Sequence, residues 1–169
     1  PVPAKLIIGV FMADCELIKP ISQQLAKTFG PVDMVSPWFA FDYTQYYEPE
    51  MGSGLFRRMA AFKNLIAQDQ LADIKRVTNG IEAEYAGDRK RRVNIDPGYL
   101  LRERFVLATG KNFSHRIYIG KHIYADLTLI YTKGGFQALP WTYPDYAAPE
   151  MTDFLLQARS KYVFDLKES

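Results

Sequence analysis

The pattern of hydrophobic and polar residues near the N-terminus predicts a strand followed by a helix. Residues 5–11 form a short apolar run, which is typical of a buried strand. The apolar residues that follow recur every four positions, the spacing of an amphipathic helix; they are Leu17, Ile21, Leu25 and Phe29. Gly30-Pro31 is a strong stop signal, so we expect this helix to end there.

The middle of the chain predicts two further strands, a loop and a second helix. β-Branched and aromatic residues favour a strand over 33–43. We interpret residues 55–65 as a strand, although their apolar spacing fits a helix as well. The Pro, Gly and Ser content of residues 46–54 indicates a loop between them. Apolar residues spaced by three or four positions predict a helix over 69–85.

Beyond residue 91 the pattern changes to short segments separated by turn residues. The strands expected there are residues 92–95, 103–109, 115–119, 123–131 and 136–139. Asp96-Pro97-Gly98, directly after the first of these strands, has the composition of a tight turn. Apolar residues at helical spacing predict a C-terminal helix over 148–166.

These elements predict an α+β fold in a single domain over residues 1–169. The first half reads β-α-β-β-α-β, the order of a ferredoxin-like split βαβ unit. The second half adds antiparallel strands and a C-terminal helix. We therefore expect one large, mostly antiparallel sheet, with the helices on one of its faces.

The composition is that of a globular protein and excludes several other classes. Hydrophobic residues make up 48% of the 169 residues and charged residues 24%, which excludes a disordered chain. No apolar run reaches the roughly 20 residues that span a bilayer, so we expect no membrane segment. Cys15 is the only cysteine and the sequence shows no signal peptide, which favours a cytoplasmic location.

The net charge of +2 hides an uneven distribution. Residues 89–133 contain ten Lys or Arg and only three Asp or Glu. Such a segment is able to present a basic patch to phosphate or another anion, but strands with basic solvent-facing sides would give the same count. The small net charge, and the acids among the aromatic segments, disfavour nucleic acid as the partner.

Sequence motifs for several common chemistries are absent. The chain has no G-x-x-x-x-G-K-[ST] phosphate loop, no G-x-G-x-x-G dinucleotide loop, no G-x-S-x-G nucleophile elbow and no H-E-x-x-H zinc motif. The two histidines, His115 and His122, have few acids near them in the sequence, so we predict no metal site. The sequence assigns no cofactor.

Polar residues at three places suggest a ligand site, although each place also has a simpler structural interpretation. Asn94 and Asp96 share one face of a strand end, or belong to a plain turn. The loop over 109–116 carries hydrogen-bond donors and His115, or simply connects two strands. The aromatic residues of 38–47 line a pocket, or pack in the core. The candidate catalytic residues are Asp42, Asp96 and His115, and the candidate ligand-binding residues are Asn94, Lys111, Ser114, Arg116, Tyr46 and Glu50.

Four strings of the sequence resemble an uncharacterised prokaryotic family catalogued as domain of unknown function 4416. They are F-D-Y-T at 41–44, Y-Y-E-P-E-M-G at 46–52, R-V-N-I-D-P-G-Y-L at 92–100 and W-T-Y-P-D-Y at 141–146. The resemblance covers nearly the whole chain and implies no activity, because the family has no assigned catalytic residues. Some members carry a GTP-binding label, which does not transfer to a chain without a phosphate loop or an N-K-x-D string.

The sequence therefore supports two functions of different classes. The first is a cytoplasmic domain, a binding protein or an enzyme, that takes a small anionic or phosphorylated ligand. The alternative is a non-catalytic homo-oligomeric binding or scaffolding protein that uses exposed aromatic residues. RNA binding through residues 89–92 is a weaker third hypothesis.

Overall fold

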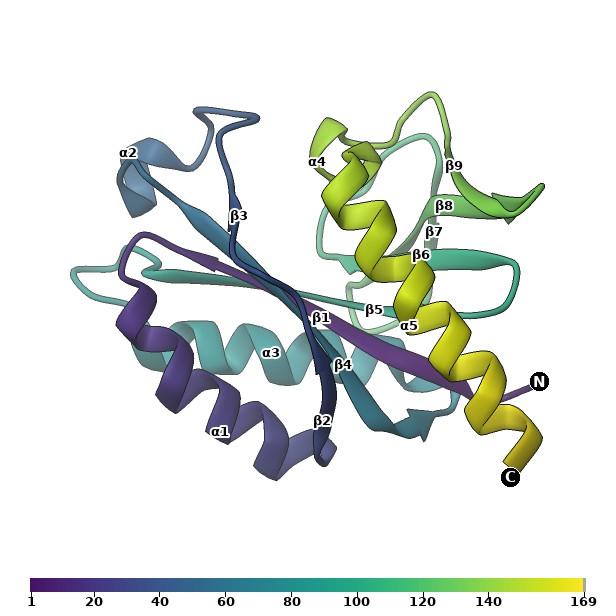
Figure 1. Cartoon of the computed structure of the whole chain (residues 1–169). Helices are drawn as coiled ribbons and strands as arrows, with labels where there is room; N and C mark the ends of the chain where they lie inside the picture. The colour runs from purple at the N-terminus through teal and green to yellow at the C-terminus, as the bar shows by residue number, and fades with distance from the viewer. Residues whose placement is uncertain (169) are drawn as a thin grey trace.

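A computed structural model describes residues 1–168 and arranges them as one antiparallel sheet with helices on both faces (Figure 1). The strands are β1 (Ala4–Met12), β2 (Val32–Val35), β3 (Phe39–Ala40), β4 (Phe56–Ile66), β5 (Val93–Leu100), β6 (Arg104–Thr109), β7 (Arg116–Tyr118), β8 (Tyr124–Thr132) and β9 (Gly135–Ala138). The α-helices are α1 (Ile18–Phe29), α2 (Glu48–Met51), α3 (Leu71–Tyr85), α4 (Pro144–Ala147) and α5 (Pro149–Glu168). Short 3-10 turns, η1 (Cys15–Leu17) and η2 (Gln68–Gln70), lead into α1 and α3.

The sheet contains the predicted ferredoxin-like unit and extends it. Its strand order is β2-β4-β1-β5-β6-β8-β7, with β3 also paired to β4 and β9 to β8. The segment β1-α1-β2-β4-α3-β5 is a split βαβ unit, and its four strands lie in the order β2-β4-β1-β5. The α+β class, the large antiparallel sheet and the C-terminal helix are therefore confirmed.

The prediction that the helices cover one face is wrong, because α5 packs on the face opposite α1 and α3. Alternate residues of a strand point to opposite faces, and every residue of β1 is buried. One set of its side chains packs on α1 and α3, in a core that includes Leu6, Ile8, Val10, Ile21, Leu25, Ile74 and Ile81. Ile7 belongs to the other core, with Met151, Leu155 and Ala158 of α5. A strand that is buried on both sides needs cover on both.

The predicted turn at Asp96-Pro97-Gly98 is also wrong, since β5 runs straight through it and pairs with β1 along its whole length. β5 pairs with β6 only over Gly98–Leu100. Pro97, which has no backbone N–H to donate, therefore lies just before the point where this pairing begins, and no hydrogen bond to β6 is lost there. A Cβ on Gly98 would lie 2.5 Å from the carbonyl oxygen of Val106. The glycine thus permits the close approach of β6 at the point where pairing begins.

Two short helices occur in segments where the sequence predicts none. Within the loop expected over 46–54, α2 forms one turn that begins beside Pro49, and α4 forms another that begins at Pro144. Both lie at the same edge of the molecule (Figure 1). No helix within residues 1–168 combines the length and apolar character needed to span a bilayer.

Candidate functional site

A cleft of about 760 Å³ opens where β5 and β6 separate. Residues of two segments line it: a first arm, residues 39–51, which carries β3 and α2, and a second arm, residues 139–146, which leads into α4. Both segments lie at the same edge of the molecule in Figure 1. Side chains of both arms, of α3, and of the ends of β5 and β6 line the cleft. Seven of these lining residues are aromatic: Phe41, Tyr43, Tyr46, Tyr47, Trp141, Tyr143 and Tyr146.

Two side chains of α3 complete the free edge of β5 at the floor of the cleft. The backbone N–H of Ile95 donates to Oε1 of Glu82 at 2.7 Å, and its carbonyl oxygen accepts from Nζ of Lys75 at 3.1 Å. These contacts satisfy backbone groups that a neighbouring strand would otherwise pair. Both side chains are buried, and burial raises the pKa of Glu82. The helix therefore satisfies the edge of β5 that faces away from β1, where β6 does not pair with it.

Arg57 of β4 is the central buried charge of the site. Its guanidinium forms an ion pair with Asp145 of the second arm, and a longer one, 3.7 Å, with Asp96 of β5. The guanidinium carbon also lies 4.5 Å from the ring centroid of Phe41, in a cation–π contact. Burial alone would lower the pKa of Arg57, but the carboxylates of Asp145 and Asp96 raise it.

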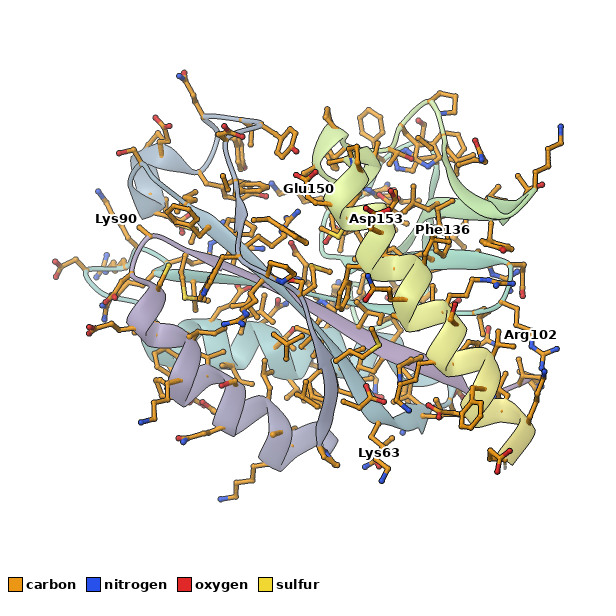
Figure 2. The ribbon with its side chains drawn as sticks, in the orientation of Figure 1. Lys63, Lys90, Arg102, Phe136, Glu150 and Asp153 are labelled. Atoms are coloured by element: carbon orange, nitrogen blue, oxygen red, sulfur yellow. The ribbon has the colours of Figure 1, made fainter. Side chains whose placement is uncertain are left out.

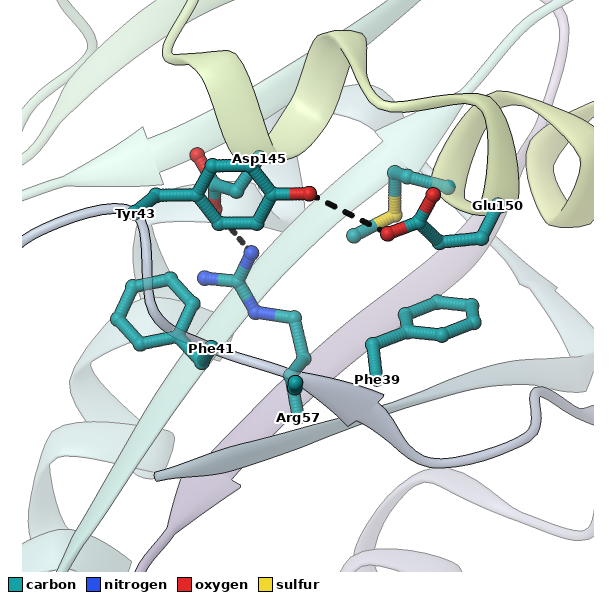
Figure 3. A pocket seen from close by; sticks show the side chains of 8 residues that line it. Phe39, Phe41, Tyr43, Arg57, Asp145 and Glu150 are labelled. Carbon is teal, nitrogen blue, oxygen red and sulfur yellow. Dashed lines mark hydrogen bonds and ion pairs between the residues drawn. The ribbon is translucent and has the colours of Figure 1, made fainter. Parts of the chain in front are cut away.

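Each arm contacts a neighbouring element at a small pocket beside the main cleft. Figure 3 shows the Arg57 side chain reaching past Phe41 to Asp145, while Tyr43 extends over it toward Glu150 at the start of α5. The hydroxyl of Tyr43 donates to Oε1 of Glu150 at 3.2 Å. Burial, together with the charge of Glu150, raises the pKa of Tyr43. The second arm is therefore held to β4 by the ion pair between Asp145 and Arg57, and the first arm to α5 by the hydrogen bond from Tyr43 to Glu150.

Hydrogen-bond donors remain unused on the floor of the cleft. Four buried side-chain atoms within residues 1–168 have no hydrogen-bond partner in the protein, and three of them belong to cleft-lining residues. These three are Nε of Arg57, Nδ2 of Asn94 and the hydroxyl of Tyr146. Burial raises the pKa of Tyr146, which keeps its hydroxyl a donor. Because unpaired buried donors are costly, the three point to a partner that the protein alone does not supply.

Asn94 is held in one orientation by a neighbouring ion pair. Arg91 donates to Oδ1 of Asn94 at 2.8 Å and forms a two-point contact with Glu50 of the first arm. That contact lowers the pKa of Glu50. The oxygen of the Asn94 amide is thereby occupied, and its NH2 group is the unpaired end.

Lys111 differs from the other cations of the cleft. Arg57, Lys75, Arg91 and Arg116 each form an ion pair with a carboxylate, whereas Lys111 has none within residues 1–168. Its Nζ donates to the hydroxyl of Tyr46 at 2.9 Å, which lowers the pKa of that phenol. The exposed Lys111 is thus the one cleft-lining cation in the described chain without a compensating acid.

His115 lies behind the wall of the cleft. Its Nε2 is 3.0 Å from Oδ2 of Asp126, the oxygen that also accepts from Nε of Arg116 at 2.9 Å. The imidazole stacks on Trp141, with ring centroids 4.9 Å apart and planes 13° from parallel. His115 does not itself line the cleft, but it contacts Trp141 and Asp126, and both of these residues line it.

The structure brings together some of the residues predicted from the sequence and leaves others outside. Those that line the cleft are Tyr46, Asn94, Asp96, Lys111 and Arg116. Glu50 and His115 contact lining residues without lining the cleft themselves. Asp42 and Ser114 are exposed and lie outside the lining. The three predicted segments therefore meet at one cleft, although two of their residues point elsewhere.

Sequence reasoning missed Arg57, Lys75, Glu82, Asp126 and Asp145. A signal existed for the helix: Lys75 and Glu82 are seven residues apart, on the same stripe as the apolar positions of α3, where charges are rarely buried without a partner. Arg57 likewise occupies a buried position in the alternation of β4. Nothing local in the sequence indicates its pairing with Asp145, which lies 88 residues away.

The basic residues of 89–133 do not form a single patch. Lys90 and Arg102 lie at opposite ends of the molecule (Figure 2). Arg91, Lys111 and Arg116 line the cleft, where Glu50 and Asp126 neutralise the two arginines. Within the described part of the chain, no three His, Cys, Asp or Glu side chains gather in a group able to hold a metal ion.

Comparison with known proteins identifies a family and no activity. No curated protein and no solved structure matches the chain significantly. The sequence profile of the family described as "Domain of unknown function (DUF4416)" matches residues 2–162. This range holds both arms, the sheet and the whole cleft lining. The chain therefore belongs to the DUF4416 family.

Proposed function

We propose that this protein binds a small anionic molecule, phosphorylated or carboxylated, in the cleft between the two arms. The observation that carries the proposal is the set of unpaired donors on Arg57, Asn94 and Tyr146. A ligand that supplies acceptor oxygens would satisfy all three, and anionic oxygens accept hydrogen bonds more strongly than neutral ones.

The charges at the mouth of the cleft agree with this choice. Most lining cations already have carboxylate partners, so the cleft would not attract a polyanion such as nucleic acid. Lys111 alone adds an uncompensated positive charge, which suits a ligand with one or two negative charges.

The size and lining of the cleft fit a small molecule as well. Its volume of about 760 Å³ lies within the usual range for small-molecule sites, and its aromatic rings surround a few fixed polar groups. A cytoplasmic location, which the free Cys15 favours, is part of this proposal. Asp96, the half-buried carboxylate of the floor, is the residue that would act as acid or base if the bound ligand reacts.

Titration calorimetry with inorganic phosphate and citrate tests the proposal. We expect saturable binding to the wild-type protein, weakened about tenfold in Lys111→Ala because a hydrogen bond to a charged group is lost. Lys63→Ala is the matched control, since Lys63 is an exposed lysine of β4 outside the cleft lining. Equal binding by the two variants, or no saturable binding of any anion, contradicts the proposal.

A second function is favoured by a specific observation at the far edge of the sheet. β7 is an edge strand, and four apolar residues in and beside it are exposed: Phe113 (63%), Ile117 (68%), Tyr118 (57%) and Ile119 (36%). Exposed apolar edge strands tend to pair with another chain. We propose self-association through β7 as the alternative function. Sedimentation equilibrium of the wild type and of Ile117→Lys tests it, and a wild-type monomer at micromolar concentration removes it.

A further inference from the structure

We infer that the ligand of the cleft is polyhydroxylated: a sugar or polyol that carries one anionic group. This inference rests on the proposed function and adds the chemistry of the uncharged part of the ligand. Its basis is a neighbouring acceptor and donor on β5, the carboxylate of Asp96 and the NH2 group of Asn94.

Asp96 has acceptor capacity that the protein does not use. Its Oδ1 lies 3.8 Å from Nζ of Lys75, and its Oδ2 lies 3.7 Å from Nη2 of Arg57. Both distances exceed hydrogen-bond range, so neither oxygen accepts a hydrogen bond from residues 1–168. The side chain is 25% exposed and lines the cleft, which leaves both oxygens available to a donor on the ligand.

Asn94 supplies the complementary group two residues earlier on the same strand. Arg91 occupies its amide oxygen, so the 4% exposed side chain presents only its NH2 group, without a partner. Residues i and i+2 of a strand share one face, and their Cα atoms are about 6.6 Å apart. In register, Asn94 lies opposite Phe11 and Asp96 opposite Gly9, so no side chain of β1 projects beside Asp96.

The charges around Asp96 select the kind of donor. Lys75 and Arg57 place positive charge near both of its oxygens, which disfavours a third cation such as an amino group on the ligand. A neutral hydroxyl donates without adding charge. A hydroxyl also accepts, so the same kind of group satisfies Asn94.

Asn94 and Asp96 lie two positions apart on one face of β5. A ligand with several hydroxyl groups offers both the acceptor that Asn94 requires and the donor that Asp96 requires. The exposed rings of Tyr43 and Tyr143 then face the apolar carbon skeleton of such a ligand.

Calorimetry with four probes tests this inference: inorganic phosphate, glucose 6-phosphate, sorbitol 6-phosphate and AMP. We expect at least one of the two hydroxylated phosphates to bind wild-type protein about tenfold more tightly than inorganic phosphate, the gain of one well-placed hydrogen bond pair. Asp96→Asn should remove that gain, so that the hydroxylated phosphate no longer binds more tightly than inorganic phosphate to the same variant.

A second variant separates loss of recognition from loss of folding. Asn94→Asp keeps the oxygen that accepts from Arg91 and replaces the NH2 group by an acceptor. This variant should also lose the tighter binding of glucose 6-phosphate or sorbitol 6-phosphate relative to inorganic phosphate. Its circular dichroism spectrum should be that of the wild type.

The outcomes that overturn the two proposals differ. If inorganic phosphate binds and neither hydroxylated phosphate binds more tightly, the inference is wrong and the proposed function stands. The same holds if AMP is preferred and Asp96→Asn has no effect. If none of the four probes binds, the proposed function fails and this inference fails with it.

Discussion

Glu82 accepts the backbone N–H of Ile95 at 2.7 Å, so a helix side chain occupies the position where a neighbouring strand would pair. The contact lies where β6 has separated from β5 and the cleft begins. The same helix supplies Lys75 to the carbonyl oxygen of Ile95. The cleft therefore depends on α3 as much as on the strands that border it.

Glu82→Ala should destabilise the protein by about 1–3 kcal/mol, because it leaves a buried N–H without a partner. Glu84→Ala is the matched control, since Glu84 is exposed and accepts a hydrogen bond from the side-chain amide of Gln24; its effect should stay within about 0.5 kcal/mol. Urea unfolding of both variants gives the two values. Similar values would mean that α3 does not hold the edge of β5.

The two glutamates near Arg91 should contribute to stability with opposite dependence on pH. Burial raises the pKa of Glu82, so the folded protein retains this proton to higher pH than the unfolded chain. The stability contributed by Glu82 therefore declines as the pH rises above roughly 4.3. The ion pair with Arg91 lowers the pKa of Glu50, so its contribution is present above that pH and declines as the pH falls below it.

Urea unfolding between pH 3 and 7 separates these contributions. The stability of Glu82→Gln relative to wild type should increase with pH, and that of Glu50→Gln should decrease. Parallel curves for the two variants would contradict the environments described for these side chains.

Gly98→Ala should destabilise the protein by about 1–3 kcal/mol, because the new methyl group meets the backbone of β6. Gly80→Ala provides the control. Gly80 lies in α3 with nothing within 4 Å of an added Cβ, so alanine should stabilise the helix by about 0.5–1 kcal/mol. Denaturation midpoints that move in the same direction for both variants would show that β6 does not approach β5 at Gly98.

Arg57→Met should cost about 3–5 kcal/mol, since it leaves the buried carboxylate of Asp145 without its partner. The double variant Arg57→Met with Asp145→Asn should recover part of that loss, because it removes the unpaired charge. Arg58→Met is the control, as Arg58 is only half-buried and donates to the carbonyl oxygen of Ser36. A double variant no more stable than the single one would contradict the pairing.

The long helices and most strands of this fold could be predicted from local sequence, whereas α2, α4 and the assembly of the sheet with its helices could not, or only in part. The uninterrupted apolar run of β1 predicts a buried strand, and the same run contains the evidence for cover on both faces. Asp96-Pro97-Gly98 has turn composition but lies in a strand, because the free edge beside Pro97 and the close approach at Gly98 come from other segments.

The candidate site was predictable to a similar extent. Asn94, Asp96 and Lys111 stand out by their polar character and by their position near the ends of predicted strands, and all three line the cleft. Arg57 and Asp145 do not stand out in the sequence, because nothing near either residue indicates the ion pair that forms when the fold brings them together.

The most direct test of a ligand on the floor of the cleft is the side-chain amide signal of Asn94 in a nitrogen–proton correlation spectrum, recorded while glucose 6-phosphate is added. Asn94→Asp assigns the signal by its absence. We predict a saturable shift of the Asn94 NH2 resonances as this unpaired donor gains a partner. The indole N–H of Trp141, a lining residue that donates to the carbonyl oxygen of Leu127, should shift with it because the ligand changes its surroundings. Shifts confined to the exposed basic residues Arg89, Lys90 and Arg92, with Asn94 unmoved at saturation, would contradict the central claim.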